Sequence, residues 1–147
     1  MRNKILTFLL EQVPPGAVLT AAVSGGKDSM AMLHALEDLS GALPFTLRAA
    51  HFHHGLRGSE ADRDRDFVEN YCRQRDIPVS LGHGDVKAYA MEHGMGDEEA
   101  ARTLRYSYLR EVAREGYLLT AHTAEDNLET VLMHLLRGSG LHGLTGI

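Results

Sequence analysis

Short apolar runs and amphipathic stretches alternate along the chain. Ala17 to Val23 is a nearly continuous apolar run of strand length, which is typical of a strand buried on both faces of a parallel sheet. We predict strands over residues 17–23, 45–52, 77–81 and 117–121, and helices over residues 2–12, 29–39, 60–75 and 97–114. This alternation predicts an α/β fold, in which a doubly wound parallel sheet carries helices on both faces.

The last part of the chain contains one more helical pattern, with an acidic start. Apolar residues recur at helical spacing over residues 128–136, which predicts a final helix that packs one face on the sheet. Glu125, Asp126 and Glu129 lie near its start, where carboxylates could bind Mg²⁺, and we expect Asp126 and Glu125 as the ligands. Helix capping, with Thr123 as the N-cap, is an alternative role for this segment, and both roles can hold.

Polar and glycine-rich segments follow all the strands predicted before residue 122. In open α/β sheets the ligand binds beyond the carboxyl ends of the strands. Five of the nine histidines lie in these segments, which are Ser24–Ser29, His51–Gly58, Gly82–Asp85 and His122–Asp126. The sequence therefore predicts a ligand site at this edge of the sheet.

The segment from Ser24 to Ser29 has the features of a phosphate-binding turn. Two adjacent glycines let the backbone turn tightly and present N–H groups to an anion, and the helix start adds a partial charge of roughly +0.5. Lys27 and the serine hydroxyls can complete the grip on phosphate oxygens. Asp28 stands where a Walker A motif needs Ser or Thr, so this is not that motif. An ordinary turn with a capped helix is the alternative.

Three histidines lie together after the second predicted strand. We expect His51, His53 and His54 to contact nucleotide or substrate, with hydrogen bonds to the loop backbone as the alternative. A zinc site is disfavoured because no Cys or matched second pair lies at a usual ligand spacing.

Composition limits the partners of the protein. Its 147 residues, 44% hydrophobic and 24% charged, predict one compact domain over residues 1–147. The formal charge of −5 argues against a surface that grips a polyanion everywhere, so any RNA contact must be local or supplied elsewhere. A single cysteine, Cys72, and no apolar run near the ~20 residues of a membrane span predict a cytoplasmic protein with no membrane partner.

Four segments together resemble the PP-loop family, whose enzymes cleave ATP between the α and β phosphates and hold the leaving pyrophosphate. The first is the S-G-G-x-D-S pattern of Ser24–Ser29. The other three are His53–Arg57, Glu98–Tyr106 and His122–Ile147, which in order and spacing resemble the tRNA(Ile)-lysidine synthetase branch. These motifs touch most of the chain from Ser24 onward.

The resemblance implies a ligation that uses ATP and Mg²⁺, with tRNA(Ile) and L-lysine as partners. ATP would adenylate C2 of the wobble cytidine, and the lysine side-chain amine would then displace AMP. The implied nucleotide contacts are Ser24, Gly25, Gly26, Lys27, Asp28, Ser29, His51, His53 and Arg137. The implied tRNA contacts are His54, Arg57, Arg102 and Arg105, and the implied catalytic residues are Arg105, His122, Asp126 and Glu129.

Arg102 and Arg105 have one further interpretation. They are three residues apart and share a helix face, so both guanidinium groups could reach phosphate oxygens bidentately, as the resemblance implies. Pairing with Glu98 or Glu99 on a solvated face is the alternative.

Two other functions stay open at this point. A PP-loop enzyme that thiolates tRNA shares the phosphate-binding turn, but such enzymes generally need paired cysteines. A module that binds adenine nucleotide without catalysis would not need the acidic segment.

The lysidine synthetases that this chain resembles are longer proteins. We therefore expect the chain to be an N-terminal fragment of such an enzyme, and we expect the fragment to lack the last strand of the sheet. We therefore expect an unpaired sheet edge beside Tyr117–Ala121, and self-association through that edge.

Overall fold

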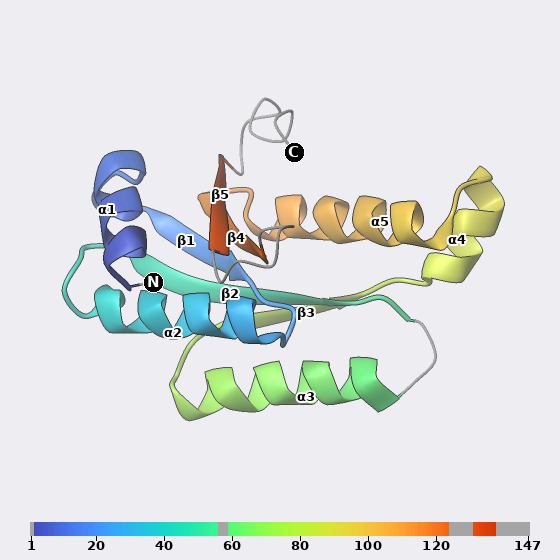
Figure 1. Ribbon diagram of the computed structural model, residues 1–147, viewed down its shortest axis with the longest axis horizontal. Coiled ribbons are helices and arrows are strands. Elements are labelled where there is room, and N and C mark those ends of the chain that lie inside the picture. The colour runs from blue at the N-terminus through green and yellow to red at the C-terminus, as the bar shows by residue number, and fades with distance from the viewer. Residues whose placement is uncertain (1, 56–58, 124–130, 138–147) are drawn as a thin grey trace.

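The computed structural model of the protein describes residues 2–55, 59–123 and 131–137 (Figure 1). Its helices are α1 (Arg2–Gln12), α2 (Lys27–Ser40), α3 (Ser59–Gln74), α4 (Val86–His93) and α5 (Asp97–Val112). Its strands are β1 (Val18–Ala22), β2 (Thr46–His53), β3 (Val79–His83), β4 (Tyr117–Thr123) and β5 (Val131–Arg137). All the strands and helices predicted before residue 122 are present, and their ends lie close to the predicted ones.

The strands of the described part form one sheet in the order β3-β2-β1-β4-β5. The pairs β1–β2, β1–β4 and β2–β3 are parallel, whereas β5 runs antiparallel to β4. Helices α2 and α3 cover one face and α5 covers the other (Figure 1). The doubly wound α/β fold is confirmed. Because β2 and β4 flank β1 on opposite sides, the strand order reverses between β1 and β4, which is where ligands bind in such sheets.

Apolar clusters hold the helices on both faces of the sheet. Leu19 and Leu119 are buried with residues of α1, α2 and α3 on one face. Ala50 and Leu118 are buried against Leu109 of α5 on the other face. Successive strand residues point to opposite faces, so a central strand covered by helices on both sides reads as a continuous apolar run.

Helix α4 was not expected from the sequence. It is only eight residues long, and its apolar face is narrow. Local signals define its ends: the Asp85 carboxylate accepts a hydrogen bond from the Ala88 N–H at 3.0 Å, and Gly94 adopts the left-handed conformation that ends many helices.

The final helix expected from the sequence is wrong over residues 131–137. These residues form β5, which pairs with β4 along its whole length. A short apolar run fits a strand and a buried helix equally well, so spacing alone could not separate the two.

The pairing of β5 also corrects two linked expectations. The edge beside Tyr117–Ala121 is covered by β5, and the sheet is parallel only from β3 to β4. The expected self-association rested on that open edge and loses this basis.

Candidate functional site

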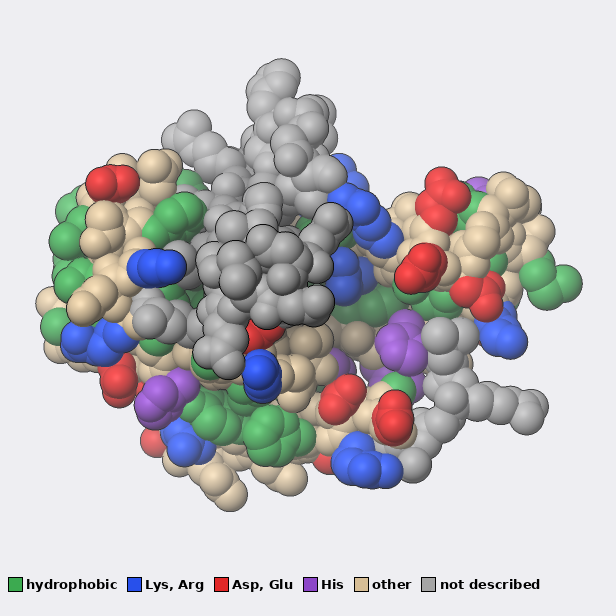
Figure 2. All heavy atoms as spheres, in the orientation of Figure 1, with side chains coloured by type: hydrophobic (Ala, Val, Ile, Leu, Met, Phe, Trp, Pro, Cys, Tyr) green, Lys and Arg blue, Asp and Glu red, His purple; other side chains and the backbone are tan. Residues whose placement is uncertain are grey.

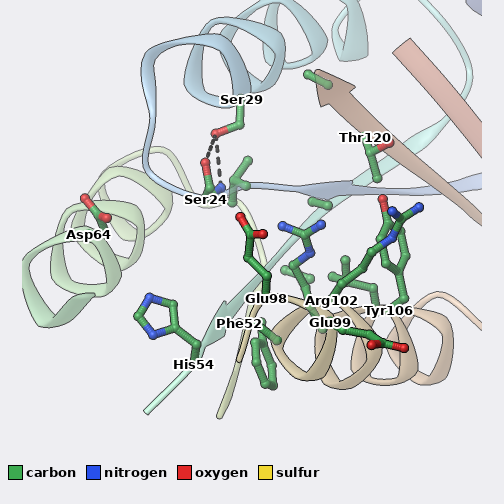
Figure 3. A pocket seen from close by; sticks show the side chains of 17 residues that line it. Ser24, Ser29, Phe52, His54, Asp64, Glu98, Glu99, Arg102, Tyr106 and Thr120 are labelled. Carbon is green, nitrogen blue, oxygen red and sulfur yellow. Dashed lines mark hydrogen bonds between the residues drawn. The ribbon is translucent and has the colours of Figure 1, made fainter. Parts of the chain in front are cut away.

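A cavity of about 810 Å³ opens at the carboxyl ends of β1, β2 and β4, where the strand order reverses. In Figure 3, Ser24 and Ser29 lie at the turn between β1 and α2, His54 and Asp64 lie on one side, and side chains of α5 lie on the other. Figure 2 shows a hollow between the body of the molecule and the lobe that contains α4, with basic and histidine side chains beside it. The predicted edge of the sheet therefore carries a cavity of the size that small ligands use.

The turn from Ser24 to Ser29 is held by its own hydroxyl groups. The Ser29 Oγ accepts from the Ser24 N–H at 3.0 Å and donates to the Gly26 carbonyl at 3.2 Å. Since that hydroxyl has one hydrogen, the 3.1 Å contact between the two serine Oγ atoms is a donation from Ser24. The Ser24 Oγ in turn accepts from the Gly26 N–H at 3.2 Å. The turn is thus ordered before any ligand arrives.

Gly25 is required by both its conformation and its surroundings. Its φ is +93°, a region that L side chains rarely adopt. A Cβ there would lie 3.0 Å from the Asp64 Cβ and 3.3 Å from the Asp64 Cα, so α3 packs directly on the turn. Lys27 and Asp28 form the first turn of α2 and lie outside the cavity lining. The start of α2 faces this turn and adds its partial positive charge.

Helix α5 contributes the charged wall of the cavity. Arg102 and Arg105 line it together with Glu98 and Glu99. The Arg105 guanidinium carbon lies 5.0 Å from the centroid of the Tyr106 ring, and that of Arg102 lies 5.8 Å from it, within the range of cation–π attraction. The structure thus brings both arginines to the cavity that the phosphate-binding turn borders.

Contacts with β2 and β3 fix α5 in place. The Tyr108 hydroxyl and the Ser80 Oγ are 2.5 Å apart, and the Tyr108 ring lies 5.8 Å from the Phe52 ring. A Cβ at Gly82 would collide with the Tyr108 ring, so the glycine lets the ring approach the sheet. Burial raises the pKa of the Tyr108 phenol, so it stays neutral as a hydrogen-bond partner.

The three histidines expected at the site have different surroundings. His51 is buried, and its Nδ1–H donates to the Val23 carbonyl at 2.8 Å. Burial lowers the pKa of His51, and the bond to Val23 acts in the opposite direction. His53 contacts Asp62 and lies outside the lining, whereas His54 lines the cavity.

Several expected site residues lie outside the described part of the chain: Arg57, Glu125, Asp126 and Glu129. The backbone of His122 lies in β4 and that of Arg137 in β5, but their side chains are outside that part as well. Within residues 2–55, 59–123 and 131–137, no group of three or more His, Cys, Asp or Glu side chains could hold a metal ion. None of the helices described is long and apolar enough to cross a membrane.

The cavity also contains residues that sequence reasoning missed. Phe52, Asp64, Tyr106 and Thr120 line it, and none was named as a site residue, although Phe52 and Tyr106 lie within the segments His51–Gly58 and Glu98–Tyr106. The signal for Phe52 and Thr120 is their place near the carboxyl ends of strands that flank β1. Asp64 had no such signal, because it lies in the middle of an amphipathic helix.

The lining fits an adenine nucleotide. Val23, Ala50 and Phe52 offer apolar surface for a base, while the Ser24–Ser29 turn and the two arginines offer donors for phosphates. Three carboxylates, from Asp64, Glu98 and Glu99, share this cavity with two guanidinium groups. A polyphosphate would therefore need additional positive charge, which a divalent cation supplies.

Fold and cavity together define an α/β nucleotide-binding domain, and the chain belongs to the PP-loop domain family, whose model matches residues 2–147. The relatives are tRNA-modifying enzymes by name. A tRNA(Ile)-lysidine synthase of Dehalococcoides mccartyi (strain CBDB1) is 44% identical over 152 residues, which span 100% of this chain and 32% of the relative. One of Bacillus subtilis (strain 168) is 40% identical over 135 residues, which span 90% of this chain and 28% of the relative. The chain thus spans about a third of the length of these relatives.

A solved structure shares the fold. It is titled "U34-tRNA thiolase NcsA from Methanococcus maripaludis with its [4Fe-4S] cluster" and aligns with a TM-score of 0.71 over 83% of this chain and 44% of that one. The sequence identity is 20%, so this likeness supports the fold alone.

Proposed function

We propose that this chain is the ATP-using catalytic domain of a tRNA(Ile)-lysidine synthetase, a ligase that converts ATP to AMP and diphosphate. The observation that carries the proposal is the cavity that joins the Ser24–Ser29 turn to Arg102 and Arg105 at the reversal of strand order. The relatives, which are lysidine synthases by name and 44% and 40% identical, support the choice of substrate.

The first step of the proposed reaction is attack on ATP by the wobble cytidine. The O2 atom of the cytidine bonds to the α-phosphorus, and the bond to the β-phosphate oxygen breaks, so diphosphate leaves. The turn and the N-terminus of α2 hold the departing diphosphate, and Arg105 balances its negative charge. Arg102 and Arg105 also offer a local contact for tRNA phosphates.

The second step is attack of the neutral lysine ε-amine on C2 of the adenylated cytidine. A new C–N bond forms, the C2–O bond breaks, and AMP leaves with the oxygen. Neither step needs a protein nucleophile, so positioning and charge stabilisation are the main demands on the protein. His122, Asp126 and Glu129 are the candidates for the base that takes the amine proton.

Mg²⁺ is part of the proposal. When bound, it would neutralise phosphate charge, and Glu125 and Asp126 are its proposed ligands. The excess of carboxylates over guanidinium groups in the cavity supports the need for such a cation.

The proposal extends to the setting of the reaction. We place the enzyme in the cytoplasm and treat residues 1–147 as one domain of a longer protein with lysine and tRNA(Ile) as substrates.

tRNA thiolation is the second candidate from the family. The single cysteine of this chain, Cys72, is buried among apolar side chains, and burial raises the pKa of its thiol to about 11. A neutral buried thiol is a poor nucleophile, so this cysteine does not favour sulfur transfer.

Exchange of labelled diphosphate into ATP tests the order of steps. The longer protein should catalyse this exchange only when tRNA(Ile) is present, and lysine should not be required. Arg105→Ala should slow the exchange by about 10²-fold or more, which is typical for loss of a group that stabilises transition-state charge. Arg110→Ala is the matched control, because Arg110 is an exposed residue on the same helix outside the cavity lining. Exchange that requires lysine and no tRNA would contradict the proposed mechanism.

A further inference from the structure

His53 lies between two histidines, His51 and His54, whose contacts account for their positions. Its own contacts differ from those of both neighbours. His51 donates to the Val23 carbonyl, just before the phosphate-binding turn, and His54 lines the cavity. The His53 side chain is only 14% exposed, yet it is not part of the cavity lining. Its ring is turned toward α3.

Two hydrogen bonds fix the protonation of the His53 ring. The Gly55 N–H donates to Nδ1 at 3.0 Å, so Nδ1 carries no hydrogen. Nε2 lies 2.7 Å from the Asp62 Oδ1, and a carboxylate only accepts, so Nε2 carries the hydrogen and donates it. His53 is therefore a neutral ring in one tautomer, held at both nitrogens.

Asp62, the partner of His53, has stabilising contacts of its own. Asp62 lies in the first turn of α3, where a negative charge is favoured by the helix dipole. The Arg65 Nη1 lies 3.5 Å from the same Asp62 oxygen. The Asp62 carboxylate is 58% exposed, so removing it should leave the core of the protein intact.

The turn that follows β2 is tightly enclosed. The Gly84 N–H donates to the His53 carbonyl at 3.1 Å, and the Val86 N–H donates to the His54 carbonyl at 3.4 Å. Gly55 has a φ of +70°, and a Cβ there would collide with the Gly84 carbonyl oxygen. Hydrogen bonds thus fix the backbone of the turn on the side of α4, and the hydrogen bond from His53 to Asp62 connects the turn to α3.

We propose that His53 and Asp62 are a positioning pair, which fixes the turn after β2 so that the His54 imidazole is directed into the cavity and contacts the nucleotide. This rests on the proposed function, which makes the cavity an ATP site. His53 itself does not touch the nucleotide. The two neighbouring histidines thus have different roles: His53 stabilises the turn, and His54 contacts the nucleotide.

The test compares two aspartates on one helix. Asp62→Ala removes the partner of His53. Asp66→Ala is the matched control, because Asp66 is 60% exposed and also pairs with Arg65, but has no contact with His53 among those the structure shows. The measurements are ¹⁵N spectra of the imidazole rings, titration with ATP in the presence of Mg²⁺, and thermal unfolding as a check of the fold.

In the wild type we expect a single Nε2–H tautomer for His53 that ATP leaves unchanged, and a shift of the His54 signals on addition of ATP. Asp62→Ala should leave the Nε2–H of His53 without its acceptor and so shift the His53 Nε2 signal, reduce the His54 response and weaken ATP binding by about fivefold to tenfold, the loss typical of one misplaced hydrogen bond. Asp66→Ala should behave as the wild type. His53→Gln, which keeps a donor for Asp62, should bind ATP more tightly than His53→Ala.

Two results would overturn the proposal. One is wild-type ATP affinity and His54 response in Asp62→Ala. The other is a shift of the His53 signals with ATP as large as that of His54, which would make His53 a direct ligand. If the wild type bound no ATP at all, the proposed function would fail instead, so the two failures are distinguishable.

Discussion

Exchanging the two glycines of the phosphate-binding turn for alanine should separate backbone strain from loss of ligand space. Gly25 has a φ of +93°, and its added Cβ would lie 3.0 Å from the Asp64 Cβ and 3.3 Å from the Asp64 Cα. Gly26 has a φ of −75°, which any residue adopts, and among the described residues its added Cβ would meet only the Ser24 Oγ, at 3.3 Å. The pair thus differs in strain while sharing the same turn.

The magnitudes follow from these geometries. A non-glycine residue held in a sparsely populated backbone region costs about 1–3 kcal/mol, which for a chain of this size corresponds to a fall in Tm of about 3–10 °C. Gly25→Ala should show this loss, and because α3 must also move, its ATP affinity should fall as well. Gly26→Ala should change stability by about 0.5 kcal/mol or less, as is usual for an unstrained change at an exposed position, but should weaken ATP binding by about tenfold because a methyl group crowds the cradle.

Thermal unfolding and calorimetric titration with ATP and Mg²⁺ measure both effects. A Gly25→Ala protein that unfolds at the wild-type temperature and binds ATP normally would refute the assigned strain. A Gly26→Ala protein with unchanged ATP affinity would mean that the phosphates do not lie in this turn.

Three further predictions concern the metal, the core thiol and RNA. Asp126→Asn should lower the rate of the complete enzyme more than its nucleotide affinity, because a metal ligand acts most on charge that develops in the transition state; equal activity of this variant and the wild type across Mg²⁺ concentrations would contradict the assignment of Asp126 as a metal ligand. Cys72 has its pKa raised by burial from 9.0 to about 11, so its contribution to stability is complete below pH 9.0 and is lost as the pH rises toward 11. Denaturant unfolding at a series of pH values checks this against Cys72→Ala, which should lose that part of the pH dependence. Residues 1–147, with a net charge of −5, should bind tRNA weakly because they offer few cationic contacts to phosphate, and tight salt-resistant binding in a filter assay would oppose this.

The sheet was predictable because its signal is redundant. The apolar run over β1 and the alternation of strands and helices each point to a parallel sheet covered on both faces, and together they predict which strand ends carry the ligand. Ser24, Ser29 and His54 could be placed at the site for that reason, since all three lie in segments that follow the carboxyl end of a predicted strand.

Other features depended on contacts between distant segments, which no local pattern encodes. Asp64 reaches the cavity only because α3 packs on Gly25. The strand character of residues 131–137 comes from pairing with β4, and periodicity cannot distinguish that from a buried helix. The different roles of His53 and His54 follow from Asp62. This residue lies nine positions after His53 in the sequence, but its carboxylate contacts the His53 ring.

The central claim is that the cavity serves transfer of lysine to a cytidine of tRNA(Ile), and mass analysis of the nucleosides tests it most directly. The longer protein should be incubated with ATP, Mg²⁺, L-lysine and tRNA(Ile), and the tRNA then digested. The account predicts a cytidine that has gained the mass of one lysine less one water, with one AMP formed per product, and formation of both slowed by about 10²-fold in a protein carrying Arg105→Ala. A cytidine of unchanged mass, or a product that carries sulfur instead of lysine, would contradict it.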